Sequence, residues 1–356
     1  MIDNEQLNQI APLIEEVADV SLKIATFNLF NYLEPPFAFY DFERIYSIEQ
    51  WQKKQRWITH YLQQHKPDVI GFQEVFSVQS LKALVAQCGF PYFAVVDEMR
   101  VVDDYICRDP VVAIASRYPI KQVEAVVADP KISEEMGLHR EFSFSRKVLR
   151  ATLDLPHIGD CDCYVVHFKS KRPMLEFTED NTLSLEKNRV EQFKMQIAGE
   201  WGSTMQRGSE AALLFIEMIA RKETTGNAML LIGDFNNSLK DGVLNHLLSH
   251  SLRVGSQTDS ARYIGQYCLW DAWDLFQASA ENNRHIVRPP THYYGEISSV
   301  LDYILLSCEF NASYQHSIFA VTDYHTYNRH LINPSFEYDG ESTDHGVVMV
   351  TLTLRS

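Results

Sequence analysis

The sequence predicts an α/β protein whose β-sheets are covered by helices on their outer faces. Helical and strand-like segments alternate along the 356 residues, and the strand-like segments are the more numerous. Several of these strands, such as "VVAIASRYPI" (111–120), are apolar almost throughout, which is typical of sheets that are buried on both faces. No internal repeat and no linker rich in Gly, Ser or Pro divides the chain, so we expect one domain.

The elements of the first half follow from apolar spacing and from stop signals. A short amphipathic helix over residues 5–18 is expected within an N-terminal extension, residues 1–21, ahead of a single domain that spans residues 22–356. Helices are expected at 48–64, which Pro67 ends, and at 77–88, and strands at 22–30, 68–75, 91–96, 111–120, 148–155 and 161–170.

The second half begins with helical segments and ends with strands. Helices are expected at 186–201, 206–222 and 241–249, and strands at 228–235, 299–307, 316–321 and 346–354. Three stretches, 31–47, 171–185 and 322–343, are expected to be long loops, and long loops in compact domains are often functional.

Composition and charge exclude several classes of protein. With 46% hydrophobic and 22% charged residues, the chain is neither disordered nor fibrous. Its net charge of -15 leaves no basic stripe for nonspecific binding of nucleic acid, although a local basic patch can oppose the net charge. The six cysteines lack zinc-type spacing and are expected to be buried free thiols. The N-terminus lacks the features of a signal peptide and no apolar run reaches the roughly 18 residues of a membrane span, so we expect a soluble, cytoplasmic protein without a transmembrane segment.

Polar residues interrupt or end the expected strands at widely separated positions. They are Asn28, Glu74, His167, Asp234, Asp302 and the adjacent Asp344 and His345. Each has an ordinary explanation when taken alone, because aspartate and asparagine favour turns and a lone histidine is usually a core residue. A carboxylate inside an apolar strand, as at Asp302, needs a partner. Together, carboxylates, amides and two histidines at strand ends suit a divalent metal with oxygen ligands and a phosphate.

The spacing of these residues adds geometry. Side chains two residues apart on a strand share a face. Asp234 and Asn236 in "IGDFNN" would therefore point the same way, as would His167 and Lys169 in "VVHFKS". Adjacent residues such as those in "TDHG" would diverge on a strand, so they converge only if they lie in the loop before it.

Six segments occur in a fixed order between residues 22 and 354: "TFNLF", "GFQEV", "VVHFKS", "IGDFNN", "VLDYILLS" and "STDHGVV". This ordered set resembles the endonuclease/exonuclease/phosphatase superfamily, which includes deoxyribonucleases, repair endonucleases, sphingomyelinases and inositol polyphosphate phosphatases. The resemblance implies a four-layer α/β sandwich, in which two mostly antiparallel β-sheets pack face to face with helices on the outer faces. It also implies metal-dependent hydrolysis of phosphoesters.

The resemblance assigns a metal centre and a residue that acts on water. Glu74 matches the family's ligand for Mg²⁺ or Mn²⁺, with Asn28 and Asp344 beside it. Asp234 matches the aspartate that orients or deprotonates the attacking water, and Asn236 matches an asparagine that contacts the phosphate.

The resemblance also assigns two histidines and a carboxylate partner. His345 matches the histidine of the family's S-D-H motif, with Thr343 in the position of the serine, and Asp302 matches an aspartate that partners a histidine. His167 matches a histidine that stabilises the phosphorane or protonates the leaving group. Whether Asp234 or His345 accepts the proton from water stays open.

Basic residues flank two of the expected catalytic strands and suggest contacts to phosphate. "HREFSFSRKVLR" holds Arg140, Arg146, Lys147 and Arg150, and "HFKSKRP" holds Lys169, Lys171 and Arg172. We expect Lys169 and Arg150 to contact a substrate phosphate, while a solvated charged face is the alternative for the rest.

The expected activity is hydrolysis of a phosphodiester, with a nucleic acid as the expected substrate. A phospholipid, an inositol phosphate or another small phosphate ester is the alternative, because the apolar, aromatic segment 29–42 could hold a lipid or stack bases. A third hypothesis, a non-catalytic binding module, predicts that a metal or base residue is missing, and none of the expected positions is vacant. The sequence indicates no particular protein partner.

Overall fold

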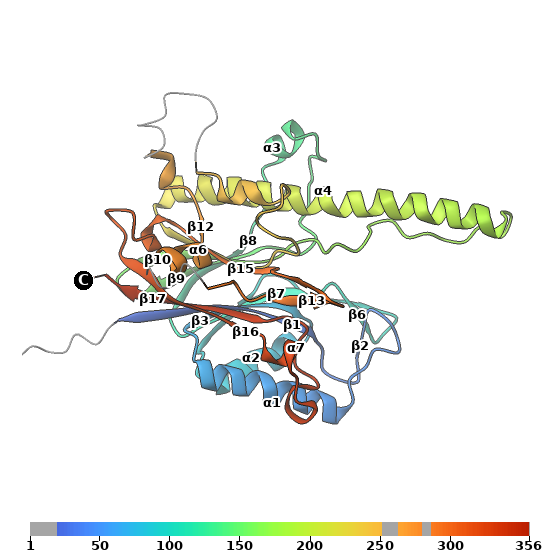
Figure 1. Ribbon diagram of the computed structural model, residues 1–356, viewed down its shortest axis with the longest axis horizontal. Coiled ribbons are helices and arrows are strands. Elements are labelled where there is room, and N and C mark those ends of the chain that lie inside the picture. Colours follow the sequence, from blue (N-terminus) through green and yellow to red (C-terminus); the bar gives the residue numbers. More distant parts are fainter. Residues whose placement is uncertain (1–19, 251–262, 280–285, 356) are drawn as a thin grey trace, which may run out of the picture.

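Two six-stranded β-sheets form the centre of the computed structural model, which describes residues 20–250, 263–279 and 286–355 (Figure 1). The helix expected at 5–18 lies outside the described residues. Among the described helices, none is both long enough and apolar enough to cross a membrane.

The first sheet has the strand order β16-β17-β1-β3-β7-β4. Its strands are β1 (Ser21–Tyr32), β3 (Val69–Val75), β4 (Tyr92–Val95), β7 (Val111–Ser116), β16 (Phe319–Tyr327) and β17 (Val347–Leu354). Neighbouring strands are antiparallel except for β1 and β3, which run parallel.

The second sheet has the strand order β12-β15-β11-β10-β9-β8. Its strands are β8 (Ile120–Ala125), β9 (Leu149–Leu155), β10 (Gly159–His167), β11 (Ala228–Asp234), β12 (Trp270–Asp271) and β15 (Asp302–Leu306). Here β10 and β11 are the parallel pair.

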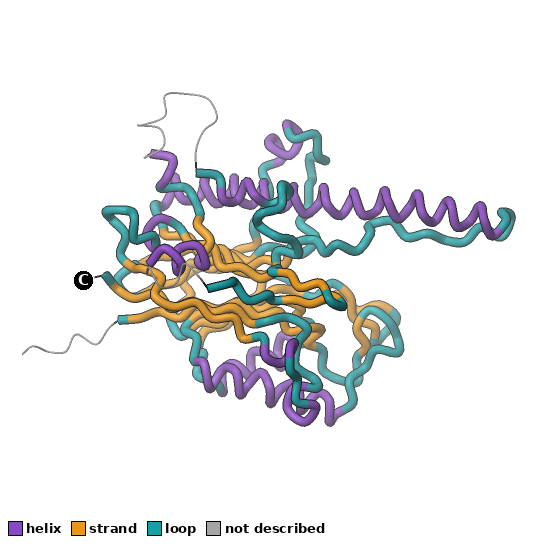
Figure 2. Tube along the Cα trace, viewed as in Figure 1, coloured by secondary structure: helices purple, strands orange, loops and turns teal. Residues whose placement is uncertain are grey.

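Helices cover the outer face of each sheet (Figures 1 and 2). The long ones are α1 (Ile48–His65) and α2 (Val78–Gln87) on the first sheet and α4 (Leu185–Thr225) on the second. The shorter helices are α3 (Pro130–Glu135), α6 (Ala272–Ser279), α7 (Arg329–Ile332) and α8 (Phe336–Asp339), with 3-10 turns η1 (Asn245–Leu248) and η3 (Cys308–Phe310). Two small sheets are formed by β2 (Ala38–Phe39), β5 (Arg100–Val102) and β6 (Ile106–Arg108), and by β13 (His292–Tyr294) and β14 (Ile297–Ser299).

Alternation along the strands separates the core into layers. On β10, Val165 belongs to the cluster between the two sheets, whereas the next residue, Val166, packs with Leu214 and Met218 of α4. On β1, Phe27 packs with the residues of α1 and α2. Successive side chains of a strand point to opposite faces, so each buried strand serves two apolar layers. The expected four-layer sandwich is confirmed.

Several boundaries differ from those expected. The helices expected at 186–201 and 206–222 are one helix of 41 residues, because no proline interrupts it and a helix tolerates interior glycines at about 1 kcal/mol each. The helix expected at 241–249 is reduced to η1. The strand expected at 316–321 is β16, which extends into the stretch expected to be a loop, and the segment 111–120 contains β7 and the start of β8.

Strand direction brings distant residues to one edge of the sandwich. Because β1 runs parallel to β3 and antiparallel to β17, the ends of β1 and β3 lie beside the start of β17. In the second sheet, the ends of β10 and β11 lie beside the start of β15, with Asp234 paired to both His167 and Asp302. All the polar interruptions of the sequence are at these ends.

Candidate active site

A close approach of two strands places Asp234 beside His167. Gly233 has a φ of 152°, and a Cβ atom added to it would lie 2.0 Å from the carbonyl oxygen of Val166 on β10. Only glycine allows this backbone conformation and this separation. The next residue, Asp234, therefore ends β11 at the level where β10 ends.

Replacing Gly233 with alanine is expected to destabilise the fold by at least about 2 kcal/mol, because it adds a steric clash to an unfavourable φ. Urea unfolding should show a lower midpoint. The matched control is Gly242→Ala, whose added Cβ meets nothing within 4 Å and which should leave the midpoint unchanged. A Gly233→Ala variant as stable as the control would contradict the close approach.

Four side chains surround a single carboxylate oxygen, Oδ2 of Asp234. The amides of Asn28 and Asn236 donate to it over 3.2 and 3.3 Å. The Nε2 atoms of His167 and His345 lie 3.4 and 3.9 Å from it. The other oxygen, Oδ1, accepts the backbone N–H of Asn236 at 2.8 Å. The two sheets thus meet at Asp234, which is buried.

The hydrogen bonds of Asn236 hold it against Asp234. β11 ends at Asp234, and Asn236 has a φ of 53°, so a turn rather than strand alternation brings the two residues together. Its amide nitrogen donates to the carbonyl oxygen of Phe168 as well as to Asp234. Both N–H groups of its amide are therefore engaged within the protein, and the expected contact of Asn236 with a phosphate stays a prediction.

His345 is held by a second buried carboxylate. Its Nδ1 lies 2.8 Å from Oδ2 of Asp302, and its backbone N–H donates to the hydroxyl of Thr343 at 3.1 Å. Burial opposes the charged imidazolium, but the charges of Asp302 and Asp234 outweigh burial and raise the pKa of His345 well above its usual value. The shift favours the protonated imidazolium of His345.

His167 and Asp234 are shifted in the opposite sense, toward their uncharged forms. Burial, and then the nearby charges of Arg146 and His345, lower the pKa of His167 well below its usual value. Burial also raises the pKa of Asp234 to about 7, where the charge of His345 opposes the shift and that of Asp302 adds to it. The site therefore combines a charged histidine, a neutral histidine and a carboxyl group poised near neutral pH.

Glu74 and Asp344 form the acidic side of the site. Glu74 has a φ of 60° at the end of β3, and its Oε2 accepts the backbone N–H of Asn31 at 2.9 Å. Burial, and then the charge of Asp344, raise the pKa of Glu74. On the neighbouring strand β1, the buried Oδ1 of Asn31 has no hydrogen-bond partner among the described residues. Two carboxylates that repel each other, with a spare amide oxygen nearby, are the oxygen-rich donor set that Mg²⁺ or Mn²⁺ takes.

Two histidine-containing groups offer another arrangement of metal ligands. Ligand atoms of His292, Asp344 and His345 lie within 4.8 Å of one another, as do those of Asp234, Asp302 and His345. Both groups require His345, whose Nδ1 already pairs with Asp302. A protonated histidine cannot bind a metal, so we favour Glu74 and Asp344 as the ligands and place Asn28 at their border with Asp234.

Arg150 and Lys169, the two expected phosphate contacts, have partners within the protein, and their contact with a phosphate stays a prediction. Arg150 pairs with Glu124 at 2.6 Å and lies opposite Tyr164, on the face of the second sheet that α4 covers. Lys169 does not share a strand face with His167, because β10 ends at His167. The ammonium of Lys169 donates instead to the carbonyl oxygens of Ser170 and Arg172.

Arg146 and Lys169 are basic residues whose charges act on the cluster. Arg146 lies in the segment before β9, and its charge lowers the pKa of His167 and opposes the raised pKa of Glu74. Its side chain also bonds Tyr40, whose pKa burial raises to about 12. In the part of the chain that the structure describes, Arg146 has no salt bridge to a carboxylate. The sequence placed Arg146 in a basic segment, but no spacing rule singles out a residue of a loop.

Lys54 is a further residue that the sequence reading did not single out, although a signal was present. Trp51, Lys54, Ile58 and Tyr61 follow one another at the spacing of a helix face, and all four are buried. A lysine on the apolar face of a helix is unusual, because burying its charge is unfavourable unless it has a partner. Its Nζ donates to the carbonyl oxygen of Ser342 at 2.8 Å, in the segment that leads to Asp344 and His345. Burial lowers the pKa of Lys54 to about 8, against the charges of Asp344 and Glu74.

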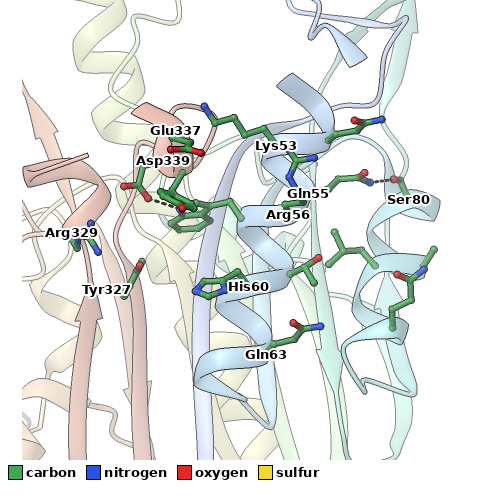
Figure 3. Close-up of a pocket in the computed structure, with 17 residues that line it drawn as sticks. Lys53, Gln55, Arg56, His60, Gln63, Ser80, Tyr327, Arg329, Glu337 and Asp339 are labelled. Atoms are coloured by element: carbon green, nitrogen blue, oxygen red, sulfur yellow. Dashed lines mark hydrogen bonds between the residues drawn. The ribbon is translucent and has the colours of Figure 1, made fainter. Parts of the chain in front are cut away.

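A cavity lies elsewhere, on the outer side of α1 and α2 (Figure 3). It has a volume of about 1060 Å³, and its lining includes Lys53, Arg56, His60, Arg329 and Asp339. None of the clustered histidines and carboxylates lines it. Groups with strongly shifted pKa values mark functional sites, so the polar cluster, and not this cavity, is the candidate active site.

Comparisons with known proteins assign the chain to a family. The model of the Endonuclease/Exonuclease/phosphatase family matches residues 25–314. A comparison with curated proteins finds no match. Among solved structures, the human Nocturnin catalytic domain with bound sulfate is 13% identical, with a TM-score of 0.52 and coverage of 95% of this chain and 96% of that one.

Two other solved structures share the fold. Truncated Caenorhabditis elegans TDP2 is 11% identical, with a TM-score of 0.52 and coverage of 94% of this chain and 98% of that one. D. rerio TDP2 complexed with single strand DNA product is 14% identical, with a TM-score of 0.51 and coverage of 94% and 99%. At these identities the structures establish the fold alone, whereas the family model covers most of the sequence. The chain therefore belongs to the endonuclease/exonuclease/phosphatase family of hydrolytic phosphoesterases.

Proposed function

We propose that the chain hydrolyses phosphodiester bonds with the help of Mg²⁺ or Mn²⁺, and that its substrate is a nucleic acid. The observation that carries the hydrolytic part is the convergence of two histidines and two asparagines on one oxygen of Asp234. The nucleic-acid part is supported by Arg146 at the cluster and by the TDP2 structure that holds a single strand DNA product.

Glu74 and Asp344 would hold the metal ion, which when bound would neutralise charge on a nonbridging phosphate oxygen and make the phosphorus more electrophilic. A phosphodiester is anionic, so it repels water as a nucleophile. The guanidinium of Arg146 attracts the same charge and would orient the phosphate toward the histidines.

The protonation states indicate a different role for each of the remaining side chains. Asp234, with a pKa of about 7, is the group that can accept a proton from the attacking water. His345 is already protonated, so it donates to a phosphoryl oxygen or to the leaving group, and Asp302 holds it in place. His167 stays neutral and can donate a hydrogen bond to the phosphate through Nε2. This assignment makes Asp234, rather than His345, the general base.

A substrate panel tests the proposal. Plasmid DNA, single-stranded RNA, sphingomyelin, inositol phosphates and a chromogenic diester would each be incubated with Mg²⁺, Mn²⁺ or a chelator. We expect metal-dependent cleavage of a nucleic acid and of the chromogenic diester. Metal-dependent cleavage confined to sphingomyelin or to inositol phosphates would overturn the substrate class, and no cleavage of any member would favour a non-catalytic binding module.

Salt dependence separates a polymer from a small substrate. If DNA or RNA is the substrate, its cleavage should fall steeply between roughly 50 and 200 mM salt, because contacts to several phosphates release counterions. Turnover of the chromogenic diester under the same conditions is the control and should change little. A flat response with the nucleic acid would contradict the polymer assignment.

A further inference from the structure

The N-terminal half of α4 extends beyond the second sheet, away from the body of the protein (Figures 1 and 2). The C-terminal half packs on that sheet through Ala211, Leu214 and Met218, all fully buried. The extended half contributes no residue to any of the apolar core clusters formed by the described residues. Something other than the core must therefore stabilise it.

One side of this extended half is covered by the segment that leads into the helix. The backbone N–H of Met174 donates to the carbonyl oxygen of Gly199, and the hydroxyl of Ser203 donates to that of Arg172. A Cβ atom on Gly199 would lie 2.8 Å from Pro173, so glycine permits the close approach. This side of the helix needs no further partner.

The opposite side carries an exposed apolar stripe, which consists of Val190, Phe193, Ile197, Trp201 and Met205. These residues recur at intervals of three and four, which is the spacing of one helix face. Ile197 and Gly199 are two residues apart, or about 200° around the helix, so the stripe faces away from the covering segment. Phe193 and Trp201 are 62% and 64% exposed. A contiguous apolar stripe of this kind indicates an interaction surface.

We propose that the apolar stripe binds the same stripe of a second copy of this chain, with the two α4 helices antiparallel and a twofold axis at Ile197. A twofold interface must be complementary to itself, so residues equally distant from the axis face each other. Phe193 then faces Trp201 of the second copy.

The charged residues of this part of α4 favour a second copy of the chain over a membrane or a nucleic acid as the partner. Between Leu185 and Arg207, the helix carries four basic residues, Lys187, Arg189, Lys194 and Arg207, and three acidic ones, Glu186, Glu191 and Glu200. A helix that binds an anionic membrane has an excess of lysine and arginine on its polar face. The balanced charges here, in a chain of net charge -15, give no such excess.

The size of the stripe fits a dimer interface. A stable interface buries about 800 Å² on each partner, and aromatic side chains bury roughly 150–250 Å² each. The apolar stripe runs over about four helical turns, or roughly 24 Å. With its two aromatic residues on either side of the centre and charged residues at the margins, it has the apolar core and polar rim of such an interface.

Sedimentation velocity of the full chain over a range of concentrations tests the proposal. The wild type should form dimers, and a Phe193→Glu/Trp201→Glu variant should raise the dissociation constant by roughly 100-fold or more, because central aromatic residues dominate such interfaces. Ile332→Glu is the matched control, since Ile332 is 61% exposed on α7, outside the stripe, and should leave dimerisation unchanged. Turnover of a small diester, or the unfolding midpoint, checks that each variant is folded.

Cross-linking tests the register. The twofold axis places Ile197 against Ile197 of the second copy, so an Ile197→Cys variant should form an intermolecular disulfide under mild oxidation. Val190→Cys is the matched control, because Val190 lies roughly 10 Å along the helix from the axis, too far from its counterpart for a disulfide. A wild type that stays monomeric overturns the dimer, as does binding to neutral vesicles by a monomer. A disulfide in the Val190→Cys variant, or none in the Ile197→Cys variant while dimers persist, overturns the antiparallel register.

Discussion

Replacing His345 with alanine is expected to lower turnover of a phosphodiester by roughly 10³–10⁴-fold, which is the range lost with a positioned proton donor. The loss should appear in kcat more than in KM, because the imidazolium acts on charge that develops as the phosphorus is attacked. Steady-state kinetics with the chromogenic diester measure it. A loss below about tenfold would show that another group donates the proton.

The control for this substitution is His60→Ala. His60 is exposed on α1 and lines the cavity of Figure 3, so its loss should leave turnover unchanged if the chemistry takes place at Asp234. A large loss in His60→Ala together with a small loss in His345→Ala would move the active site to that cavity. Unfolding midpoints show whether either variant has lost its fold.

Asp302→Asn tests why His345 is protonated. Burial lowers the pKa of His345, but the charges of Asp302 and Asp234 raise it by more. Removing the Asp302 charge should therefore lower that pKa. Since the protonated form is the active one, the alkaline limb of the pH–rate profile should move to lower pH while the acid limb, set by Asp234, moves less. An unchanged alkaline limb would contradict the assignment of His345 as the proton donor.

The polar interruptions of the strands could be identified in the sequence because each one breaks a local rule. Asp302 lies in an otherwise apolar strand, and Asp234 follows a buried one. Their convergence could not be derived from local rules, since it depends on which strands run parallel and on how two sheets face each other. The resemblance to a family supplied that information, and the observed strand order agrees with it.

The basic residues show where reading by strand alternation fails. Alternation predicts the face of a side chain only within a strand. It relates that side chain to others of the same strand, and not to those of neighbouring strands. Lys169 lies two residues past the end of β10, and Arg150 lies on a neighbouring strand whose register the sequence does not give. Arg146 lies outside any strand, so its position depends on the tertiary path of a loop. Lys54, by contrast, could have been found from the helix period alone.

Glu74→Gln is expected to lower metal-stimulated turnover by roughly 100-fold or more, because it removes the charge of a metal ligand while keeping the shape of the side chain. The same substitution should leave the stability of the fold unchanged or raise it. A carboxyl group with a raised pKa destabilises the fold above that pKa, because burial and Asp344 oppose its charge. The neutral amide should therefore unfold at the same temperature as the wild type, or a higher one, in chelator at neutral pH.

Thermal unfolding with and without metal separates these two effects of Glu74→Gln. The wild type should gain stability in Mg²⁺ or Mn²⁺, because a ligand that binds only the folded state stabilises it, and the variant should lose that gain. Glu223→Gln is the matched control, since Glu223 is exposed near the C-terminal end of α4, far from the ends of β10 and β11, and should respond to metal as the wild type does. A Glu74→Gln variant that retained both the metal-induced gain and the turnover would remove Glu74 from the metal site. The ligands would then have to be sought in the group of His292, Asp344 and His345.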